Sequence, residues 1–215
     1  MSDGHVVGQA EDDADALIVD KMLEYASNGK SVSLHANDTD IIVMLLHHWR
    51  GDMSQILVKS SYNRRGCKEW KQLDVEKAVT ELNPQVKKTI LFVHAFGGCD
   101  TTSWIHEKGK GLVAKLLAKS KEAQELANIF LQSNMSQDQI GRAGVNVFVL
   151  LYGGNSNDTL ESIRHRCYMK MAASLNRLNP SKLPPTERAA HFHSLRVYLQ
   201  VDSIYVSSMA LINQI

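Results

Sequence analysis

Closely spaced carboxylates are the residues of this chain whose types and spacing most directly permit chemistry. Asp38 and Asp40 follow residues 31–35, where apolar and polar side chains alternate with the period of a β-strand. Ligands bind at the C-terminal ends of strands in open α/β sheets. Two carboxylates so close repel each other, so we expect a cation between them or a proton on one of them. A polar turn whose aspartates cap the next helix is the alternative.

Three further aspartates stand at the ends of predicted elements. Asp13 and Asp15 open a helix that closes at Asn28-Gly29, and Asp100 follows the apolar residues 86–96. Mg²⁺ and Mn²⁺ take oxygen ligands, and two-metal phosphoryl chemistry needs several carboxylates around ions about 4 Å apart. The sequence therefore predicts a Mg²⁺ or Mn²⁺ site with five candidate ligands: Asp13, Asp15, Asp38, Asp40 and Asp100.

The composition is that of an ordinary globular protein with one sizeable core, or one domain with an appendage. The 215 residues are 44% hydrophobic and 22% charged, and the net charge of +1 means that any basic surface must be local. Cys67, Cys99 and Cys167 are odd in number and lack CxxC spacing, which suits a reducing compartment. With neither a membrane span nor a signal peptide in the sequence, we expect a nuclear or cytoplasmic protein and no membrane partner.

Short helices and strands must position the candidate residues. In the N-terminal part, the pattern predicts a helix from about residue 11 to 28, strands at 31–35 and 55–59, a turn at 60–66, a returning hairpin strand at 68–73 and a helix at 75–82 capped by Asp74. Residues 86–96 and 145–152 fit either a buried strand or a buried helix. Beyond them the pattern predicts helices at 112–131, 159–178 and 189–205, with a linker at 180–185.

The order of the acidic residues resembles the flap-endonuclease branch of PIN-like nucleases. That family has an acidic pair at a helix start, a strand ending in Asp-x-Asp, and a later Gly-Cys-Asp or Gly-Ser-Asp. Residues 94–111, HAFGGCDTTSWIHEKGKG, are similar to a HALTGCDTTSAFxGKGK segment of PIN-like proteins in invertebrate genomes that are associated with mobile elements. Residues 184–200, PPTERAAHFHSLRVYLQ, also resemble their C-terminal segment. The likeness is closest over residues 11–118.

The resemblance implies a PIN-like three-layer α/β core over residues 1–120 and a mainly helical region over residues 121–215. In the family, a strand carrying an aspartate precedes the acidic pair. Only ten residues precede Glu11 here, so we expect a core that lacks this first strand. The resemblance also implies that Asp13 and Asp15 are the first ligand pair, Asp38 and Asp40 the second, and Asp100 the last. Flap endonucleases carry glutamates in the first pair, so the shorter aspartates change its reach to a metal.

The turn Lys108-Gly109-Lys110-Gly111 resembles the helix–two-turn–helix of the same family, written there as Gly-Ile-Gly before a basic helix. Its ammonium groups and glycine amides would contact phosphates, which predicts a nucleic-acid partner, with DNA favoured over RNA. A solvated turn is the alternative. The implied function is a Mg²⁺-dependent structure-selective nuclease, truncated or degenerate. The competing interpretation is a non-catalytic nucleic-acid-binding or protein-interaction module with the same fold.

Other chemistries fit the sequence less well. The histidines at 47–48 and at 191 and 193 lack a third ligand at the spacing of a zinc site. Residues 108–112, KGKGL, lack the Lys-Ser/Thr ending of a Walker A motif. No GxSxG motif and no catalytic cysteine context is present, so covalent hydrolysis is not expected. Trp49, Trp70 and Trp104 are candidates for stacking on bases, although isolated tryptophans more often anchor a core or a surface.

Overall fold

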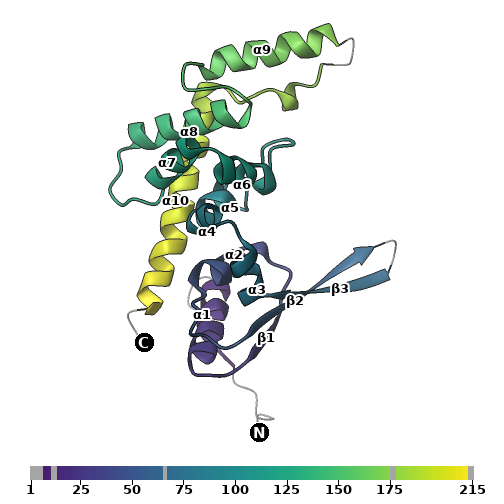
Figure 1. Cartoon of the computed structure of the whole chain (residues 1–215), viewed down its shortest axis with the longest axis vertical. Coiled ribbons are helices and arrows are strands. Elements are labelled where there is room, and N and C mark those ends of the chain that lie inside the picture. Colours follow the sequence, from purple (N-terminus) through teal and green to yellow (C-terminus); the bar gives the residue numbers. More distant parts are fainter. Residues whose placement is uncertain (1–6, 11–13, 65–66, 175–177, 213–215) are drawn as a thin grey trace. The chain divides into compact units, whose positions relative to one another are not determined.

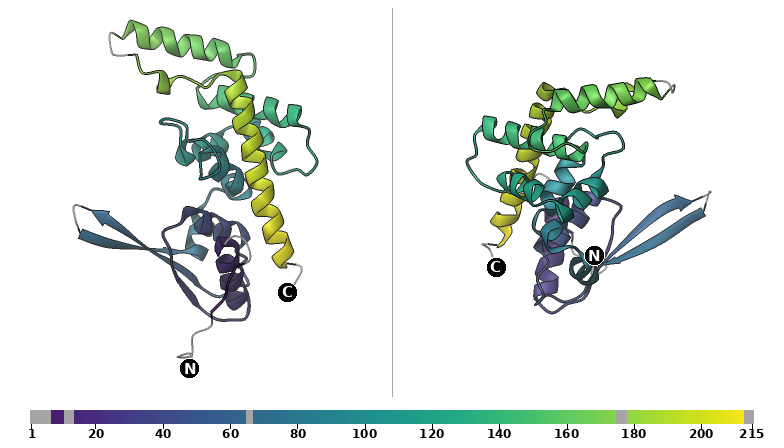
Figure 2. Two further views of the ribbon diagram at one scale, coloured as in Figure 1. Left: turned by 180° about the vertical axis from the view of Figure 1, so that it is seen from behind. Right: turned by 45° about the horizontal axis from the view of Figure 1, so that its top comes forward.

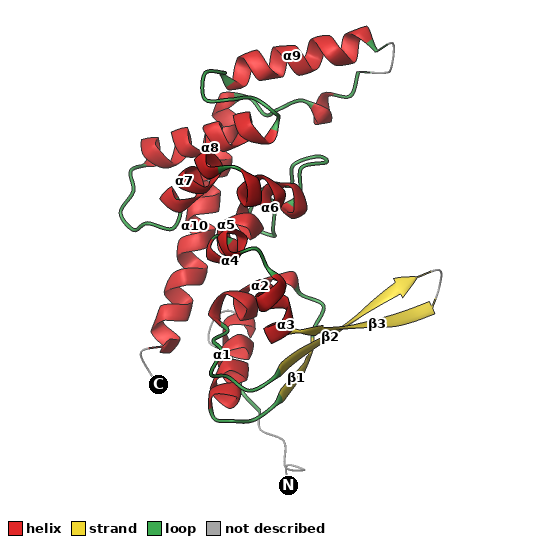
Figure 3. Cartoon of the chain, in the orientation of Figure 1, coloured by secondary structure: helices red, strands yellow, loops and turns green. Residues whose placement is uncertain are grey.

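The computed structural model describes residues 7–10, 14–64, 67–174 and 178–212 (Figure 1). The fold is mixed α/β and mostly helical, with a small three-stranded sheet, which confirms the predicted α/β class (Figure 3). The chain divides into two compact units, Met1–Glu81 with Ser207–Ile215, and Leu82–Val206. In the described ranges, no helix is both long and apolar enough to cross a membrane.

The first unit contains the sheet. Its elements are α1 (Ala14–Ser27), β1 (Val32–His35), α2 (Thr39–His48), β2 (Ile56–Arg64), β3 (Cys67–Asp74) and α3 (Val75–Glu81). Strand β1 pairs parallel to residues 56–59 of β2, with Val32 opposite Ile56. Strand β3 runs antiparallel along residues 57–64 of β2, so the outer half of this hairpin extends beyond β1 (Figure 1).

The predicted turn at residues 60–66 is wrong for residues 60–64, which continue β2. Asn and Arg are poor strand formers, but cross-strand pairs outweigh that preference. The Tyr62 hydroxyl donates to Glu69 Oε2 at 2.6 Å, and Lys71 Nζ lies 4.9 Å from the centre of the Tyr62 ring. The predicted helix end at Asn28-Gly29 is confirmed, and Gly29 adopts the positive φ of 78° that favours glycine.

The core of the first unit lies between the helices and the inner part of the sheet. Each helix buries residues at helical spacing, and β2 buries alternate residues. The buried side chains are Val19, Met22 and Ala26 of α1, Ile41, Met44 and Leu45 of α2, Ile56 and Val58 of β2, and Val75 and Val79 of α3.

The second unit is helical. Its elements are α4 (Pro84–Lys88), α5 (Ile90–Phe96), α6 (Lys110–Lys119), α7 (Lys121–Ile129), α8 (Gln137–Leu151), α9 (Leu160–Ala173), the 3₁₀ turn η1 (Pro180–Lys182) and α10 (Glu187–Ile212), which runs past the unit's last residue.

Both segments that fitted a strand or a helix are helical. Every residue of α5 is buried, and a helix buried on all sides shows no amphipathic period. Residues 145–151 complete α8, which begins at a capping box formed by Ser136 and Gln139.

The helix predicted over 112–131 is two helices, because Ser120 has an extended backbone and its side chain accepts from the Ala123 N–H. The helix predicted over 159–178 ends at Ala173, and the linker at 180–185 contains η1.

Phenylalanine rings form the centre of the second unit. Phe92 lies 5.0 Å from Phe96 and 4.8 Å from Phe130 between ring centroids, and Phe96 lies 4.9 Å from Phe148. Helix α8 approaches α10 closely because it presents glycines there. A Cβ added at Gly144 would lie 1.7 Å from Ser194 Oγ, so only glycine fits at this crossing.

Candidate functional site

The Asp38–Asp40 pair stands between the end of β1 and the start of α2. Asp38 is the N-cap of α2, and its Oδ1 accepts from the Asp40 backbone N–H at 2.8 Å. Thr39 Oγ1 donates to Asp40 Oδ1 at 3.4 Å. Asp38 thus has the capping role of the alternative interpretation. A cap occupies one oxygen of a carboxylate, so this role does not by itself decide whether the pair also binds a cation.

The segment that carries this pair is fixed to the neighbouring strand. The Ala36 N–H donates to Lys59 O at 3.1 Å, and Asn37 Oδ1 accepts from the Ser61 N–H at 2.8 Å. The chain therefore leaves β1 along β2 before it turns into α2. Asp38 is exposed and Asp40 is half-buried, so both carboxylates are held at a strand end within reach of solvent.

The remaining predicted ligands fall in different places. Asp15 is in the first turn of α1. Helix α1 and strand β1 run in opposite directions, which places the start of α1 and the end of β1 at the same end of the first unit (Figure 2). Asp13 lies outside the described residues, and Asp100 belongs to the second unit.

The described carboxylates do not by themselves form the expected Mg²⁺ or Mn²⁺ centre. Among the residues that the structure describes, no three His, Cys, Asp or Glu side chains are grouped closely enough to hold a metal ion. Such a centre needs more oxygen ligands than the adjacent pair Asp38 and Asp40 provides. The predicted metal site therefore stays a prediction.

Asp100 and the Lys-Gly-Lys-Gly turn belong to one loop, residues 97–109 between α5 and α6, which we call the α5–α6 loop. Its two ends touch: a Cβ added at Gly97 would lie 2.7 Å from the backbone N and Cα of Lys110. Gly98 has a positive φ of 99°, and a Cβ there would lie 3.0 Å from Trp104 Cα. The glycines thus close the loop at its base and bring Gly97 and Lys110, thirteen residues apart in the sequence, into contact.

Hydroxyl side chains anchor the first half of the loop. The buried Thr102 donates from Oγ1 to Ala95 O at 2.7 Å and accepts from the Cys99 N–H at 3.0 Å. Thr101 Oγ1 donates to Gln200 Oε1 at 2.6 Å, which ties the loop to α10. Asp100 lies between these anchored residues and is exposed. The loop therefore presents this carboxylate from a fixed backbone.

The second half of the loop leads into the N-terminus of α6. Lys108 Nζ lies 4.9 Å from the centre of the Tyr152 ring, a cation–π contact that positions its charge. Gly109 is the N-cap, and Lys110 and Gly111 form the first turn. The first amides of a helix have no partner within the helix, and the helix dipole is positive there. Two lysines and these amides thus combine at one end of α6.

Cys99 is a feature that the sequence analysis missed. Burial raises the pKa of its thiol, but hydrogen bonds with the side chains of His94, Thr101 and Thr102 outweigh burial and hold this pKa at about 6. Its Sγ lies 3.3 Å from Thr101 Oγ1 and 3.2 Å from Thr102 Oγ1. Only the Gly97-Gly98 reversal, which returns the chain toward α5, could have indicated this histidine–cysteine contact.

Histidines of the two pairs that were weighed as zinc ligands pack inside the protein. The rings of His47 and His48 lie 4.5 Å apart, and burial lowers the pKa of both, to about 4 for His48. His193 Nε2 lies 3.2 Å from Phe96 O. Of the tryptophans, Trp49 is buried, whereas Trp70 and Trp104 are 57% and 68% exposed. Both of these tryptophans contact a histidine ring edge-to-face, His35 for Trp70 and His106 for Trp104.

No protein-family model, curated protein or solved structure matches this chain. The resemblance carried by the Gly-Cys-Asp and Lys-Gly-Lys-Gly segments therefore stays a prediction, and the function is argued from the site.

Proposed function

We propose that this chain is a nuclease-like domain of the PIN-like, flap-endonuclease-like type, and that it binds nucleic acid, with DNA preferred over RNA. The observation that carries the proposal is the α5–α6 loop. The approach of Gly97 to Lys110 joins Asp100 to the lysine- and glycine-rich start of α6. These are the two segments on which the resemblance to that nuclease family depends.

Helix α6 supports phosphate binding. It contains Lys110, Lys115 and Lys119 and no acidic residue, so its whole length is basic. Its N-terminus combines the first backbone amides of the helix with the positive end of the helix dipole, which together favour a phosphate oxygen. Because the net charge of the chain is only +1, this local concentration of charge is what distinguishes the surface.

Phosphodiester hydrolysis with Mg²⁺ or Mn²⁺ is the second candidate function. The position of Asp38 and Asp40 at the end of a strand that pairs in parallel favours it. The described residues form no group of three metal ligands. We therefore expect this chain to bind nucleic acid even if it does not cleave it. A nuclear or cytoplasmic location fits either candidate.

Binding is tested by replacing Lys108 and Lys110 with alanine. Each lysine that neutralises a phosphate contributes about 0.9 to the slope of log affinity against log salt, so the double variant should flatten that slope by about two contacts. Affinity for duplex DNA should fall about equally for all sequences, because phosphate contacts carry no sequence information. Fluorescence anisotropy over a salt series measures both effects.

A matched double variant replaces Lys77 and Lys121, whose side chains are 74% and 89% exposed and lie 3.9 Å from Glu81 and Glu125. It removes the same charge from other surfaces and should bind like the parent. If the Lys108 and Lys110 variant also keeps the parent's affinity and salt slope, the loop has a structural role only and the protein-interaction alternative gains.

Hydrolysis is tested with flap and single-stranded DNA in Mg²⁺ and in Mn²⁺. We expect feeble cleavage or none, because two-metal chemistry depends on a complete set of carboxylates. Asp40→Asn is the diagnostic variant, since it removes the charge and keeps the size of the side chain. Rapid metal-dependent cleavage that Asp40→Asn abolishes would overturn this expectation and establish the second candidate.

A further inference from the structure

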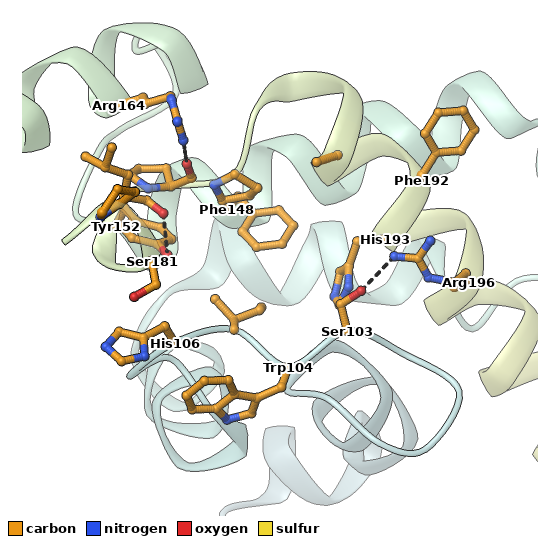
Figure 4. Close-up of a pocket in the computed structure, with 16 residues that line it drawn as sticks. Ser103, Trp104, His106, Phe148, Tyr152, Arg164, Ser181, Phe192, His193 and Arg196 are labelled. Carbon is orange, nitrogen blue, oxygen red and sulfur yellow. Dashed lines mark hydrogen bonds between the residues drawn. The ribbon is translucent and has the colours of Figure 1, made fainter.

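A pocket of about 440 Å³ lies within the second unit (Figure 4). Five segments form its wall: the second half of the α5–α6 loop, the end of α8, Arg164 of α9, the chain around η1 and the first half of α10. Its volume falls in the range of small-molecule sites, about 300–1,000 Å³. The pocket adjoins the proposed phosphate-binding turn through Lys108, which contacts the ring of Tyr152 in the pocket wall.

The wall is aromatic and cationic. Aromatic rings come from Trp104, Phe148, Tyr152 and Phe192, and guanidinium groups come from Arg164 and Arg196. None of the described residues that line the pocket is acidic. The lining thus complements a ligand that is flat and negatively charged.

Arg196 is placed to bind the charged part of such a ligand. It donates from Nη2 to Ser103 Oγ at 2.8 Å, which holds its guanidinium beside the residue that precedes Trp104 (Figure 4). A guanidinium has five N–H donors in a planar fork that matches a phosphate, so one bond to Ser103 leaves donors for a ligand. Arg164 instead donates to Pro184 O and positions the opposite wall.

The same pocket offers a stacking surface beside the buried His193. Trp104 is 68% exposed, so much of its ring is open to a ligand. His193 is 3% exposed, and its Nε2 donates to Phe96 O, which leaves Nδ1 as an acceptor. This Nδ1 has no hydrogen-bond partner among the described residues. This atom is fully buried, so a ligand in the pocket would meet other parts of the His193 side chain rather than Nδ1.

We propose that this pocket binds one nucleotide, with the base stacked on Trp104 and the phosphate paired with Arg196. A nucleotide joins a flat ring and a phosphate in one molecule, whereas inorganic phosphate would leave the aromatic wall unused. The nucleotide is either free or the end of a strand held by the α6 turn. The choice of a nucleotide over another aromatic anion rests on the proposed function.

The test is calorimetric titration of the full chain with deoxyadenosine monophosphate. Trp104→Ala and Arg196→Gln should each weaken binding about tenfold or more, as expected for loss of one stacked base or one phosphate contact. Trp70→Ala and Arg142→Gln remove another exposed tryptophan and an arginine that pairs with Asp138, and they should leave binding unchanged. Binding of deoxyadenosine, which has no phosphate, should be weakened by Trp104→Ala and unchanged by Arg196→Gln.

The outcomes separate this inference from the proposed function. Absence of saturable nucleotide binding, or equal binding by Trp104→Ala, overturns the inference, even if the lysine variant confirms DNA binding. Saturable binding that Trp104→Ala removes supports the pocket, even if the lysine variant shows no effect on DNA. If inorganic phosphate binds as tightly as the nucleotide, the pocket is an anion site only and the nucleotide inference is overturned. A 5′-phosphorylated single strand that binds more tightly than the mononucleotide identifies a strand end as the source, and weaker binding identifies the free nucleotide.

Discussion

Gly144→Ala is expected to destabilise the second unit by about 2 kcal/mol, although alanine is the better helix former by about 1 kcal/mol. The new methyl group would lie 1.7 Å from Ser194 Oγ and 2.5 Å from Ser194 Cβ. Rotation of Ser194 can move its hydroxyl, but its Cβ is fixed to the backbone of α10. The helices must therefore separate, which disturbs the contacts on both sides of the crossing. Urea unfolding, read out by hydrogen exchange of the α8 amides, measures the loss.

Gly111→Ala is the matched control, because it is also a helical glycine and a Cβ there would meet no atom within 4 Å. It should be neutral or stabilise by up to about 1 kcal/mol. Combining Gly144→Ala with Ser194→Gly, which removes the clashing atoms, should recover part of the loss, and a double-mutant cycle isolates this coupling. Additive effects would contradict the close crossing.

Local sequence signals predicted much of the first unit. Alternation located β1, Asn28-Gly29 located the end of α1, and Asp74 located the start of α3, where its Oδ1 accepts from the Lys77 N–H at 3.2 Å. Each of these signals acts within a few residues, so it is readable without tertiary structure. The length of the β2–β3 hairpin could not be read from local signals, because its outer half depends on pairing between the strands.

Local sequence signals predicted less of the second unit. Helix α5 is buried on every side, so its sequence contains no period that separates a helix from a strand. The division between α6 and α7 depends on one serine, a residue that helices tolerate and caps prefer. The apolar run at 145–152 was predictable in principle, since the Ser136–Gln139 capping box marks a helix start upstream of it.

The site was predictable only in parts. The aspartates at 38 and 40 fit a metal ligand pair and a helix cap equally well, because both roles use the same carboxylate oxygens. Asp100 and the turn at Lys108 are brought together by the contact between Gly97 and Lys110. These two residues are thirteen positions apart, so no local sequence pattern predicts the contact. The pocket is built from five segments between residues 103 and 196, and of its lining only Trp104 and His193 were considered from the sequence, neither of them as part of a pocket.

Acid is expected to destabilise the second unit through His193. Burial lowers the pKa of this imidazole to about 4, and nearby Arg196 adds to the effect, while the hydrogen bond to Phe96 O opposes it. In the unfolded chain histidine titrates near 6.5. Between these values the unfolded state binds more protons, so stability is fully present above pH 6.5 and is lost as the pH falls toward 4. A difference of 2.5 pKa units corresponds to a loss of about 3 kcal/mol at pH 4.

His193→Gln keeps an N–H donor for Phe96 O, although the exchange of a buried ring should make the variant less stable than the parent at pH 7. Because glutamine cannot be protonated in this range, the variant should lose much less stability than the parent between pH 7 and pH 4. Hydrogen exchange of the α8 amides at both pH values measures the difference. His165→Gln changes an exposed histidine of α9 and should leave the pH dependence of the parent intact. Curves for His193→Gln and the parent that stay parallel from pH 7 to pH 4 would show that the pKa of His193 is the same in the folded and unfolded chain, which would contradict this prediction.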